Sequence, residues 1–281
     1  SQPTLSTLIT RLEEELDVTI FDRSSHPIKP TTIGEKLIAQ ARVTLFHLSQ
    51  FKEISLSERE LNAGQLRVGI IPTVAPYILP ALFNEIHKSY PQIDLHVSEQ
   101  QTSVIIEQIK KAELDMAILA TPLNIDGILE IPLYYEKFLA YISPQEPIYQ
   151  ETEIQSNLMP TDHLWVLKEG HCMRNQVFNF CDSKTSYSNI YEAGSISTLV
   201  GIVDANGGYT VIPELHHPLL NSEQQKNVRQ LSTPTPVREI SLIIRQDYVR
   251  QTLINALVDT IKHIIPEHMI DARLKKFAIK L

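Results

Sequence analysis

The sequence lacks any long hydrophobic run. No stretch approaches the ~18–20 uninterrupted apolar residues that a membrane-spanning helix needs, and residues 1–16 are polar and acidic, unlike a signal peptide. The chain has only two cysteines, too few for the disulfide framework of a small secreted protein. We therefore expect a cytoplasmic protein with no membrane partner. In such a protein a cysteine pair is more typical of redox, catalytic or metal chemistry than of a structural bond.

An excess of positive charge is also lacking. The 281 residues include 25 Lys+Arg and 33 Asp+Glu, a formal net charge of −8. This balance argues against indiscriminate binding to nucleic acids or membranes, although it leaves a local contact surface possible. The length suits about two domains, and a hydrophobic content of 43% with 21% charged residues is typical of a folded protein.

The first part of the chain predicts a helix followed by a hairpin. Apolar residues recur at helical spacing over residues 1–16, which indicates an amphipathic helix. A short strand near residues 18–21, a turn at 24–27 and a return strand at 28–31 follow. A helix and a hairpin in this order form the second half of a winged helix-turn-helix. We therefore expect a partial winged helix-turn-helix domain over residues 1–32.

A long helix is predicted next, from residue 33 to about residue 60. It contains no proline, and Ile38, Ala41, Leu45 and Leu48 repeat at the 3–4–3 spacing of a coiled-coil seam. Such a seam pairs with another chain. Gly64 can end the segment as a hinge, so residues 33–64 are predicted to be a linker and dimerisation segment.

Residues 65–281 predict an α/β domain of two lobes. Strands at 65–71, 93–97 and 114–119 alternate with helices at 74–89 and 103–111, an order that favours a parallel sheet. A second unit is predicted from strands at 138–142, 164–167 and 209–212 and helices at 171–181 and 195–205. A late strand at 240–245 and a late helix at 249–265 are expected to return to the first unit. Lobe I then covers about 65–137 and 238–281, lobe II covers about 138–237, and a binding cleft is expected between them.

Several segments resemble the LysR-type transcriptional regulators. The residues that carry the resemblance are Ser1–Gln2–Pro3–Thr4–Leu5–Ser6, Leu12–Glu13, Leu16, Phe21–Asp22–Arg23 and Thr31–Thr32–Ile33–Gly34. Residues 69–80 (GIIPTVAPYILP) and 170–181 (GHCMRNQVFNFC) are similar to the OxyR branch, the hydrogen peroxide sensors. The resemblance covers the whole chain and implies a periplasmic-binding-protein-like regulatory domain. Family members carry about two helices ahead of this point, so it also implies that residue 1 falls inside the DNA-binding domain.

The resemblance implies that the protein binds double-stranded promoter DNA. Residues 1–64 hold seven Lys/Arg and nine Asp/Glu, so charge alone would not have indicated DNA binding. The expected recognition-helix contacts to bases or phosphates are Ser1, Gln2, Pro3, Thr4 and Thr7, and the expected wing contacts to the backbone are Arg23, Lys29 and Thr31. A homodimer or homotetramer is implied, with RNA polymerase as a further possible partner.

The resemblance also implies a redox role for the two cysteines. Cys172 corresponds to the peroxidatic cysteine and Cys181 to the resolving one, with which it forms a disulfide. Thr73, Thr102, His171 and Arg238 carry over as the surroundings of the thiol, and a cellular thiol reductant is an implied partner. Asn175 stands where the branch usually has aspartate. No cofactor and no metal are expected.

The residues around Cys172 suit thiol chemistry by themselves. A thiolate attacks peroxide, and only a few per cent of an unperturbed thiol is ionised near neutrality. Cys172 lies at the predicted start of a helix, where free N–H groups and the helix dipole favour an anion, and Arg174 follows closely. Thr73 and Thr102 can supply hydroxyl donors to the same cleft, with helix capping as the alternative role.

The spacing of the cysteines has a mechanical consequence. They are nine positions apart, which spans ~13.5 Å in a helix, whereas a disulfide needs Cα atoms within ~7 Å. A bridged segment therefore cannot remain helical, and the apolar stripe of Met173, Val177 and Phe180 would have to move. Two unrelated buried cysteines are the alternative.

Two other functions compete with peroxide sensing. One is a regulator of the same architecture gated by a small organic ligand in the cleft, which substitution of Cys172 would distinguish. The other is a thiol peroxidase, which the helix-hairpin and the long pairing helix disfavour, so no enzyme is expected. A metal site at Glu214, His216 and His217 is also disfavoured, because adjacent histidines point in different directions and further ligands are lacking.

Overall fold

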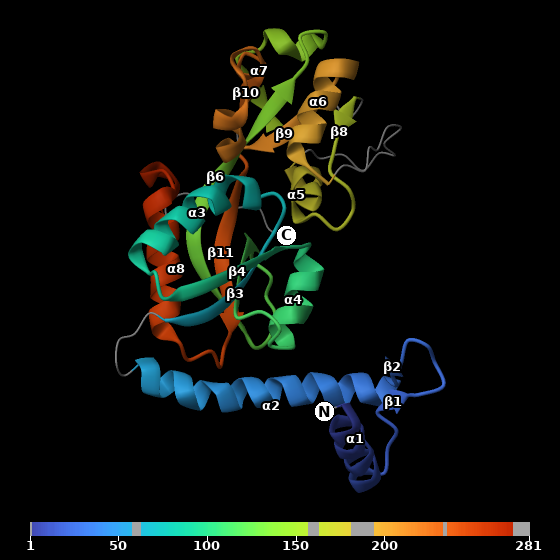
Figure 1. Ribbon diagram of the computed structural model, residues 1–281. Coiled ribbons are helices and arrows are strands. Elements are labelled where there is room, and N and C mark those ends of the chain that lie inside the picture. The colour runs from blue at the N-terminus through green and yellow to red at the C-terminus, as the bar shows by residue number, and fades with distance from the viewer. Residues whose placement is uncertain (1, 58–62, 157–162, 181–193, 233–234, 272–281) are drawn as a thin grey trace.

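The computed structural model describes residues 2–57, 63–156, 163–180, 194–232 and 235–271 (Figure 1). The helices are α1 (Gln2–Leu16), α2 (Thr32–Ser57), α3 (Ala75–Ser89), α4 (Thr102–Lys110), α5 (Cys172–Phe180), α6 (Ile196–Asn206), α7 (Ser222–Gln225) and α8 (Gln251–Ile264). The strands are β1 (Phe21–Asp22), β2 (Lys29–Pro30), β3 (Gly64–Ile70), β4 (Ile93–Glu99), β5 (Met116–Thr121), β6 (Ile128–Ile142), β7 (Glu153–Gln155), β8 (Leu164–Trp165), β9 (Tyr209–Pro213), β10 (Val228–Ser232) and β11 (Val237–Arg245). Short 3₁₀ turns are η1 (Pro147–Gln150), η3 (Glu214–Leu219) and η4 (Glu267–Met269). None of the described helices is long and apolar enough to cross a membrane.

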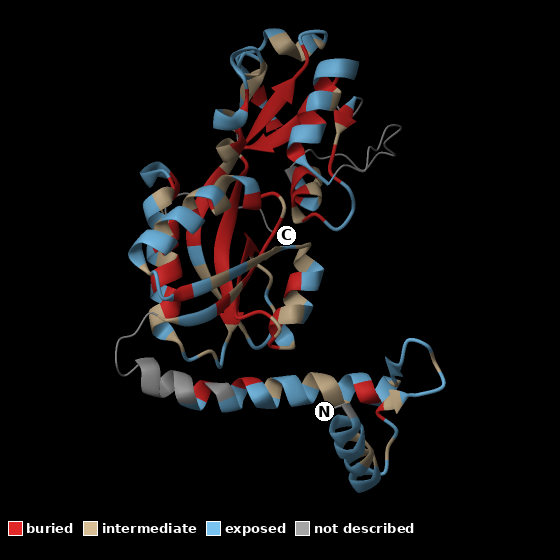
Figure 2. Cartoon of the chain, viewed as in Figure 1, coloured by how far each residue is buried: buried red, intermediate tan, exposed pale blue. Residues whose placement is uncertain are grey.

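The helix, hairpin and long helix predicted for the first part of the chain are confirmed. Strands β1 and β2 pair antiparallel, with Phe21 opposite Pro30. Glu13 on α1 holds the hairpin, because its Oε1 accepts hydrogen bonds from the backbone N–H groups of Ile20 at 2.6 Å and Phe21 at 3.0 Å. These two bonds lower the pKa of Glu13. Figure 2 shows that α1 is largely exposed, so its apolar face stays uncovered by the part of the chain that the structure describes.

The long helix α2 runs beneath lobe I (Figure 1). Leu45 and Leu48, two residues of the predicted seam, are 63% and 61% exposed, whereas Phe46 between them is only 9% exposed. The helix therefore has a free apolar side and a side that packs on the regulatory domain.

The first lobe is built on a mixed sheet. Its strand order is β4-β3-β5-β11-β6, and β3 pairs parallel with both β4 and β5. This confirms the predicted parallel unit, but β11 pairs antiparallel with both β5 and β6. The late strand and late helix return to lobe I, as predicted. Figure 1 shows the sheet between α3 and α8 on one side and α4 on the other.

Strand β6 connects the two lobes. It is 15 residues long, with Leu133 and Tyr134 in the core of lobe I and Phe138–Ile142 in the core of lobe II. The sequence predicted only this second half, because charged residues and Pro132 interrupt the apolar pattern of the first half. A shift in the β6–β11 register between Ile240 and Ser241 accommodates the proline, which cannot donate a ladder hydrogen bond.

The second lobe was predicted less completely. β9 pairs antiparallel with β6 and parallel with β8, and β10 lies between β6 and β7. Strands β7 and β10 were not predicted, since each is short and mostly polar. Helix α6 covers this lobe through Ile196, Leu199, Val200 and Val203, all buried.

Two glycines of lobe II provide a matched test of the fold. Gly208 has φ +82° and lies against the carbonyl oxygen of His163 and the ring of Trp165, whereas Gly201 in α6 has open space around its Cα. We expect Gly208→Ala to lower the free energy of unfolding by about 2 kcal/mol or more, because the added methyl group overlaps backbone and the dihedral is unfavourable for alanine.

Gly201→Ala should instead raise the free energy of unfolding by ~0.5–1 kcal/mol. Urea unfolding of both variants measures the difference. Equal stability of Gly208→Ala and the unmodified protein would contradict the described turn.

Candidate functional site

Cys172 is the first residue of α5, where lobe II meets lobe I. Two residues earlier Gly170 has φ +96°, and a Cβ there would lie 2.7 Å from the side-chain oxygen of Gln101. Gln101 immediately precedes Thr102, the first residue of α4. Only glycine permits this close approach, which brings the start of α5 in lobe II beside the start of α4 in lobe I.

Helix α5 contacts both lobes. Met173 and Val177 are buried in the core of lobe II, while the partly buried Cys172 packs against the core of lobe I. These positions confirm two residues of the predicted apolar stripe. The side chain of Phe180 and all of Cys181 lie outside the described residues, so the resolving cysteine stays a prediction.

Opposing effects act on the thiol of Cys172. Burial raises its pKa, whereas the charge of Arg238, hydrogen bonding by Thr102 and the backbone N–H groups of Met173 and Cys172 lower it. The expected stabilisation by the helix start is present, but burial outweighs it and the net pKa is raised. The sequence suggested that Arg174 also stabilises the thiolate, and this expectation is wrong. Its guanidinium lies over the ring of Phe178, 5.5 Å from the centroid.

Arg238 lies in a fully buried polar cluster. Its Nε donates to Glu136 Oε2 at 2.8 Å, and its two other nitrogens donate to Thr73 Oγ1 at 3.0 Å and to the Thr73 carbonyl at 2.9 Å. Arg238 and Glu136 are both 0% exposed. The second oxygen of Glu136 accepts from the backbone N–H of Leu215 at 2.9 Å. The structure therefore brings Thr73 and Arg238 together, and their role around the thiol stays a prediction.

Glu136 was missed by the sequence reasoning. Burial raises its pKa, although Arg238 and the Leu215 N–H act in the opposite direction. The available signal was the one carboxylate, directly before Lys137, in a run of residues 133–142 that is otherwise apolar and aromatic. A buried carboxylate of this kind requires a cation nearby.

Gln176 is a second residue that the sequence reasoning missed. It follows Cys172 by one helical turn, so the two share a face of α5. Its side chain is fully buried, and neither amide atom has a hydrogen-bond partner among the residues that the structure describes. The Thr102 hydroxyl is buried as well, and its interaction with the Cys172 sulfur is one of the contacts that lower the pKa of the thiol. Unpaired buried polar atoms near a thiol can bind a small polar molecule.

The histidines near the site are uncharged at neutral pH. His171 is buried directly before Cys172, and burial together with the charge of Lys168 lowers its pKa. His216 is also buried, which lowers its pKa to about 4, and its Nδ1 is hydrogen-bonded to the Tyr77 hydroxyl at 2.9 Å. No group of three potential metal ligands occurs within the described part of the chain.

The predicted recognition-helix residues lie on α1, except that residue 1 falls outside the described residues. The Thr7 hydroxyl donates to the Pro3 carbonyl at 3.0 Å, a bond within the helix. Gln2 and Thr4 lie on the same helix. Their contacts with bases remain a prediction.

The predicted wing residues also have roles within the chain. Arg23 donates to Thr10 and Glu13, each at 2.9 Å. The Thr31 hydroxyl donates to the Thr19 carbonyl at 2.6 Å and accepts from the Gly34 N–H at 3.0 Å, which ties the hairpin to the start of α2. Lys29 is exposed on β2. A phosphate contact by any of them stays a prediction.

Thr102 offers a direct test of the thiol environment. In a Cys181→Ser background, Thr102→Val should raise the pKa of Cys172, because the hydroxyl that stabilises the thiolate is removed. A loss of ~1 kcal/mol slows alkylation by iodoacetamide at neutral pH about fivefold and moves the midpoint of the rate-pH profile upward.

Arg174→Met serves as the matched control for this experiment. It should leave the profile unchanged, since Arg174 lies over Phe178 rather than beside the sulfur. If Thr102→Val and the control behaved alike, Thr102 would have no influence on the thiol.

Comparisons with known proteins agree with the described geometry. Residues 59–264 match the LysR substrate binding domain, and residues 1–35 match the bacterial regulatory helix-turn-helix protein of the lysR family. The chain is 35% identical over 248 residues to a hydrogen peroxide-inducible genes activator of Haemophilus influenzae, covering 87% of this chain and 82% of that protein.

Solved OxyR structures have a similar fold. A full-length OxyR mutant of Pseudomonas aeruginosa aligns with a TM-score of 0.81 at 31% identity, covering 93% of this chain and 86% of that one. An H₂O₂-bound OxyR mutant of Corynebacterium glutamicum aligns with a TM-score of 0.70 at 27% identity, covering 100% and 89%. The chain therefore belongs to the LysR family of bacterial transcriptional regulators and, within it, is similar to the OxyR proteins.

Proposed function

We propose that the protein is a peroxide-sensing transcriptional regulator in which Cys172 is the sensor. The observation that carries this proposal is the position of the thiol. Cys172 begins a helix of lobe II, packs against the core of lobe I, and is influenced by Thr102 and Arg238 of lobe I. A chemical change at the sulfur therefore acts on both lobes. The similarity to peroxide-inducible activators and to an H₂O₂-bound OxyR structure supports the proposal.

The first chemical step is oxidation of Cys172. Its thiolate attacks one oxygen of hydrogen peroxide, an S–O bond forms, and the O–O bond breaks. The second oxygen leaves as hydroxide and becomes water on protonation, while the sulfur becomes a sulfenic acid. In this proposal Thr102, Thr73 and Gln176 orient the peroxide, and Arg238 stabilises negative charge nearby.

The second step is formation of a disulfide. The thiolate of Cys181 attacks the sulfenic sulfur, an S–S bond forms, the S–O bond breaks, and the oxygen leaves as hydroxide, which becomes water on protonation. Because α5 is helical after Cys172, the bond requires this helix to unwind. Met173 and Val177 would then leave the core of lobe II, which changes the surface of the regulatory domain. A cellular thiol reductant reverses the step.

The same proposal covers the domains and partners. Residues 1–32 bind promoter DNA, residues 33–64 link and pair two chains, and lobes I and II divide near residues 137 and 238. The separate cores on either side of the middle of β6 support this division. The exposed leucines of α2 support assembly of a dimer or tetramer, and RNA polymerase is a further proposed partner.

The proposal is tested by intact mass and thiol labelling before and after one equivalent of peroxide. Two labelled thiols should fall to none with loss of two hydrogens, since both electrons come from the two sulfurs. Cys181→Ser should gain one oxygen at Cys172, and Cys172→Ser should keep its remaining thiol.

Each alternative function gives a different result in the same experiment. Oxidation of Cys172→Ser as fast as the unmodified protein would overturn the sensor assignment and direct attention to a small-molecule effector. Continuous peroxide consumption with a reductant, rather than one oxidation per chain, would indicate a peroxidase.

A further inference from the structure

One residue of the linker helix is anchored on lobe I. Phe46 on α2 has the guanidinium of Arg245 5.4 Å from its ring centroid, and the ring of Tyr248 is stacked on it at 6.2 Å. Both partners come from the end of β11 and the turn that follows. An aromatic ring in contact with both a cation and a second ring makes a specific contact rather than incidental packing.

Polar contacts flank the anchored ring. Arg42, one turn earlier on α2, pairs with Glu113 of lobe I. His47 Nε2 lies 3.2 Å from Asp247 Oδ2. The α2 residues 42, 46 and 47 thus meet complementary groups of lobe I.

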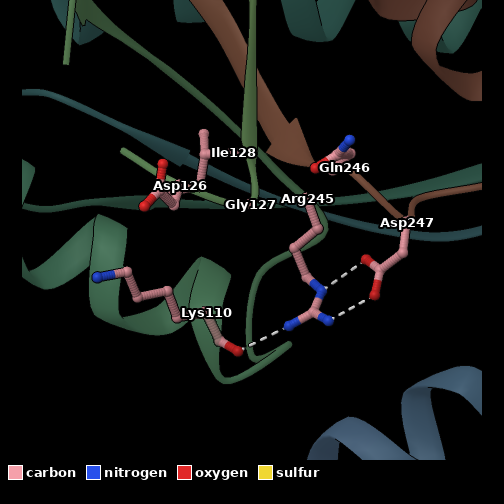
Figure 3. Close-up of a pocket in the computed structure, with 7 residues that line it drawn as sticks. All are labelled: Lys110, Asp126, Gly127, Ile128, Arg245, Gln246 and Asp247. Carbon is pink, nitrogen blue, oxygen red and sulfur yellow. Dashed lines mark hydrogen bonds and ion pairs between the residues drawn. The ribbon is translucent and has the colours of Figure 1, made fainter. Parts of the chain in front are cut away.

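The lobe I side is organised independently of α2. Asp247 binds both Nε and Nη2 of Arg245, at 2.9 Å and 2.6 Å. Nη1 of the same guanidinium donates to the Lys110 carbonyl at 2.8 Å. Figure 3 shows this fork of bonds holding Arg245 at the edge of a pocket, so the cation is already oriented for the aromatic ring.

The contact is also incompletely packed. A cavity of about 170 Å³ beside Phe46 is lined by Gln50, Gln65, Arg67 and Arg250, among others. The Gln50 side-chain nitrogen is buried there, and no residue in the described part of the chain forms a hydrogen bond with it. A charged contact with a cavity and an unpaired amide is less stable than a domain core, so it can open without unfolding either part.

The connection to lobe I favours the chain's own helix as the occupant. α2 ends at Ser57 and β3 begins at Gly64, which leaves a short link. Arg250 holds the end of that link by donating to the carbonyls of Ala63 at 2.5 Å and Gln65 at 3.0 Å. A short tether gives the attached helix a high effective concentration at this surface.

We propose that Glu113, Arg245, Asp247 and Tyr248 form a releasable docking surface, here called the linker dock, for residues 42–47 of the same chain. The linker dock holds the DNA-binding part at a defined position relative to lobe I. Opening it frees that part while the regulatory domain stays folded. The inference does not depend on the thiol chemistry of the proposed function.

Hydrogen exchange of the full chain, with both cysteines replaced by serine, tests the linker dock. We expect Phe46→Ala to raise exchange at least about tenfold in peptides covering 42–50 and 245–250, since both sides lose their shared contact. Leu48→Ala is the matched control, because Leu48 lies on the same helix but is exposed, and it should leave peptide 245–250 unchanged. Because the protein with both cysteines replaced cannot undergo thiol oxidation, the result does not depend on whether Cys172 is the sensor.

Two results would overturn the inference. One is unchanged exchange at 245–250 in Phe46→Ala. The other is an equal effect of Leu48→Ala, which would mean that a second copy of the chain provides the protection.

A charge exchange provides a second measurement. Arg42→Glu should raise exchange in peptide 42–50 about threefold, and adding Glu113→Arg should restore it, because the pair is re-formed with opposite polarity. Failure of the double variant to recover would show that residues 42 and 113 do not recognise one another.

Discussion

The buried ion pair between Arg238 and Glu136 is the interaction on which the rest of the regulatory domain depends. The two residues lie opposite each other on β11 and β6, near the point where β6 passes from one lobe core to the other. Neither charge is exposed, and an isolated charge at this depth would be strongly unfavourable. Hydrogen bonds among Arg238, Glu136, Thr73 and the Leu215 N–H satisfy the buried polar groups. The junction between the lobes therefore tolerates little change in geometry.

The reactive thiol makes use of this junction. Arg238 is fixed by groups of lobe I, whereas Cys172 belongs to a helix whose Met173 and Val177 are buried in the core of lobe II. The electrostatic environment of the sulfur therefore exists only while α5 is seated between the lobes. Burial disfavours the thiolate in this position, and the cation, the hydroxyl and the helix start compensate in part. The reactivity of Cys172 consequently depends on the contact that α5 makes with both lobes.

The sequence predicted the architecture better than the site. Regular apolar spacing was sufficient for α1, α2, α3 and the parallel strands, because one periodic face determines each element. The first half of β6 was missed since its side chains face different environments. Glu136 and Gln176 were missed for a related reason. Both matter because they are buried, and the identity of a polar residue does not reveal whether it is buried. Arg238 was identified only through resemblance, because its partners are far away along the chain.

Strand β11 has a mechanical property that follows from its position. It carries Arg238 at one end and Arg245 at the other, seven residues and about 23 Å apart. An extended backbone that is hydrogen-bonded on both edges resists stretching. A displacement of Arg238 along the axis of β11 is therefore transmitted to Arg245 at the other end. The junction of the lobes and the surface that contacts the linker helix are therefore joined by one continuous strand and cannot shift independently along its axis.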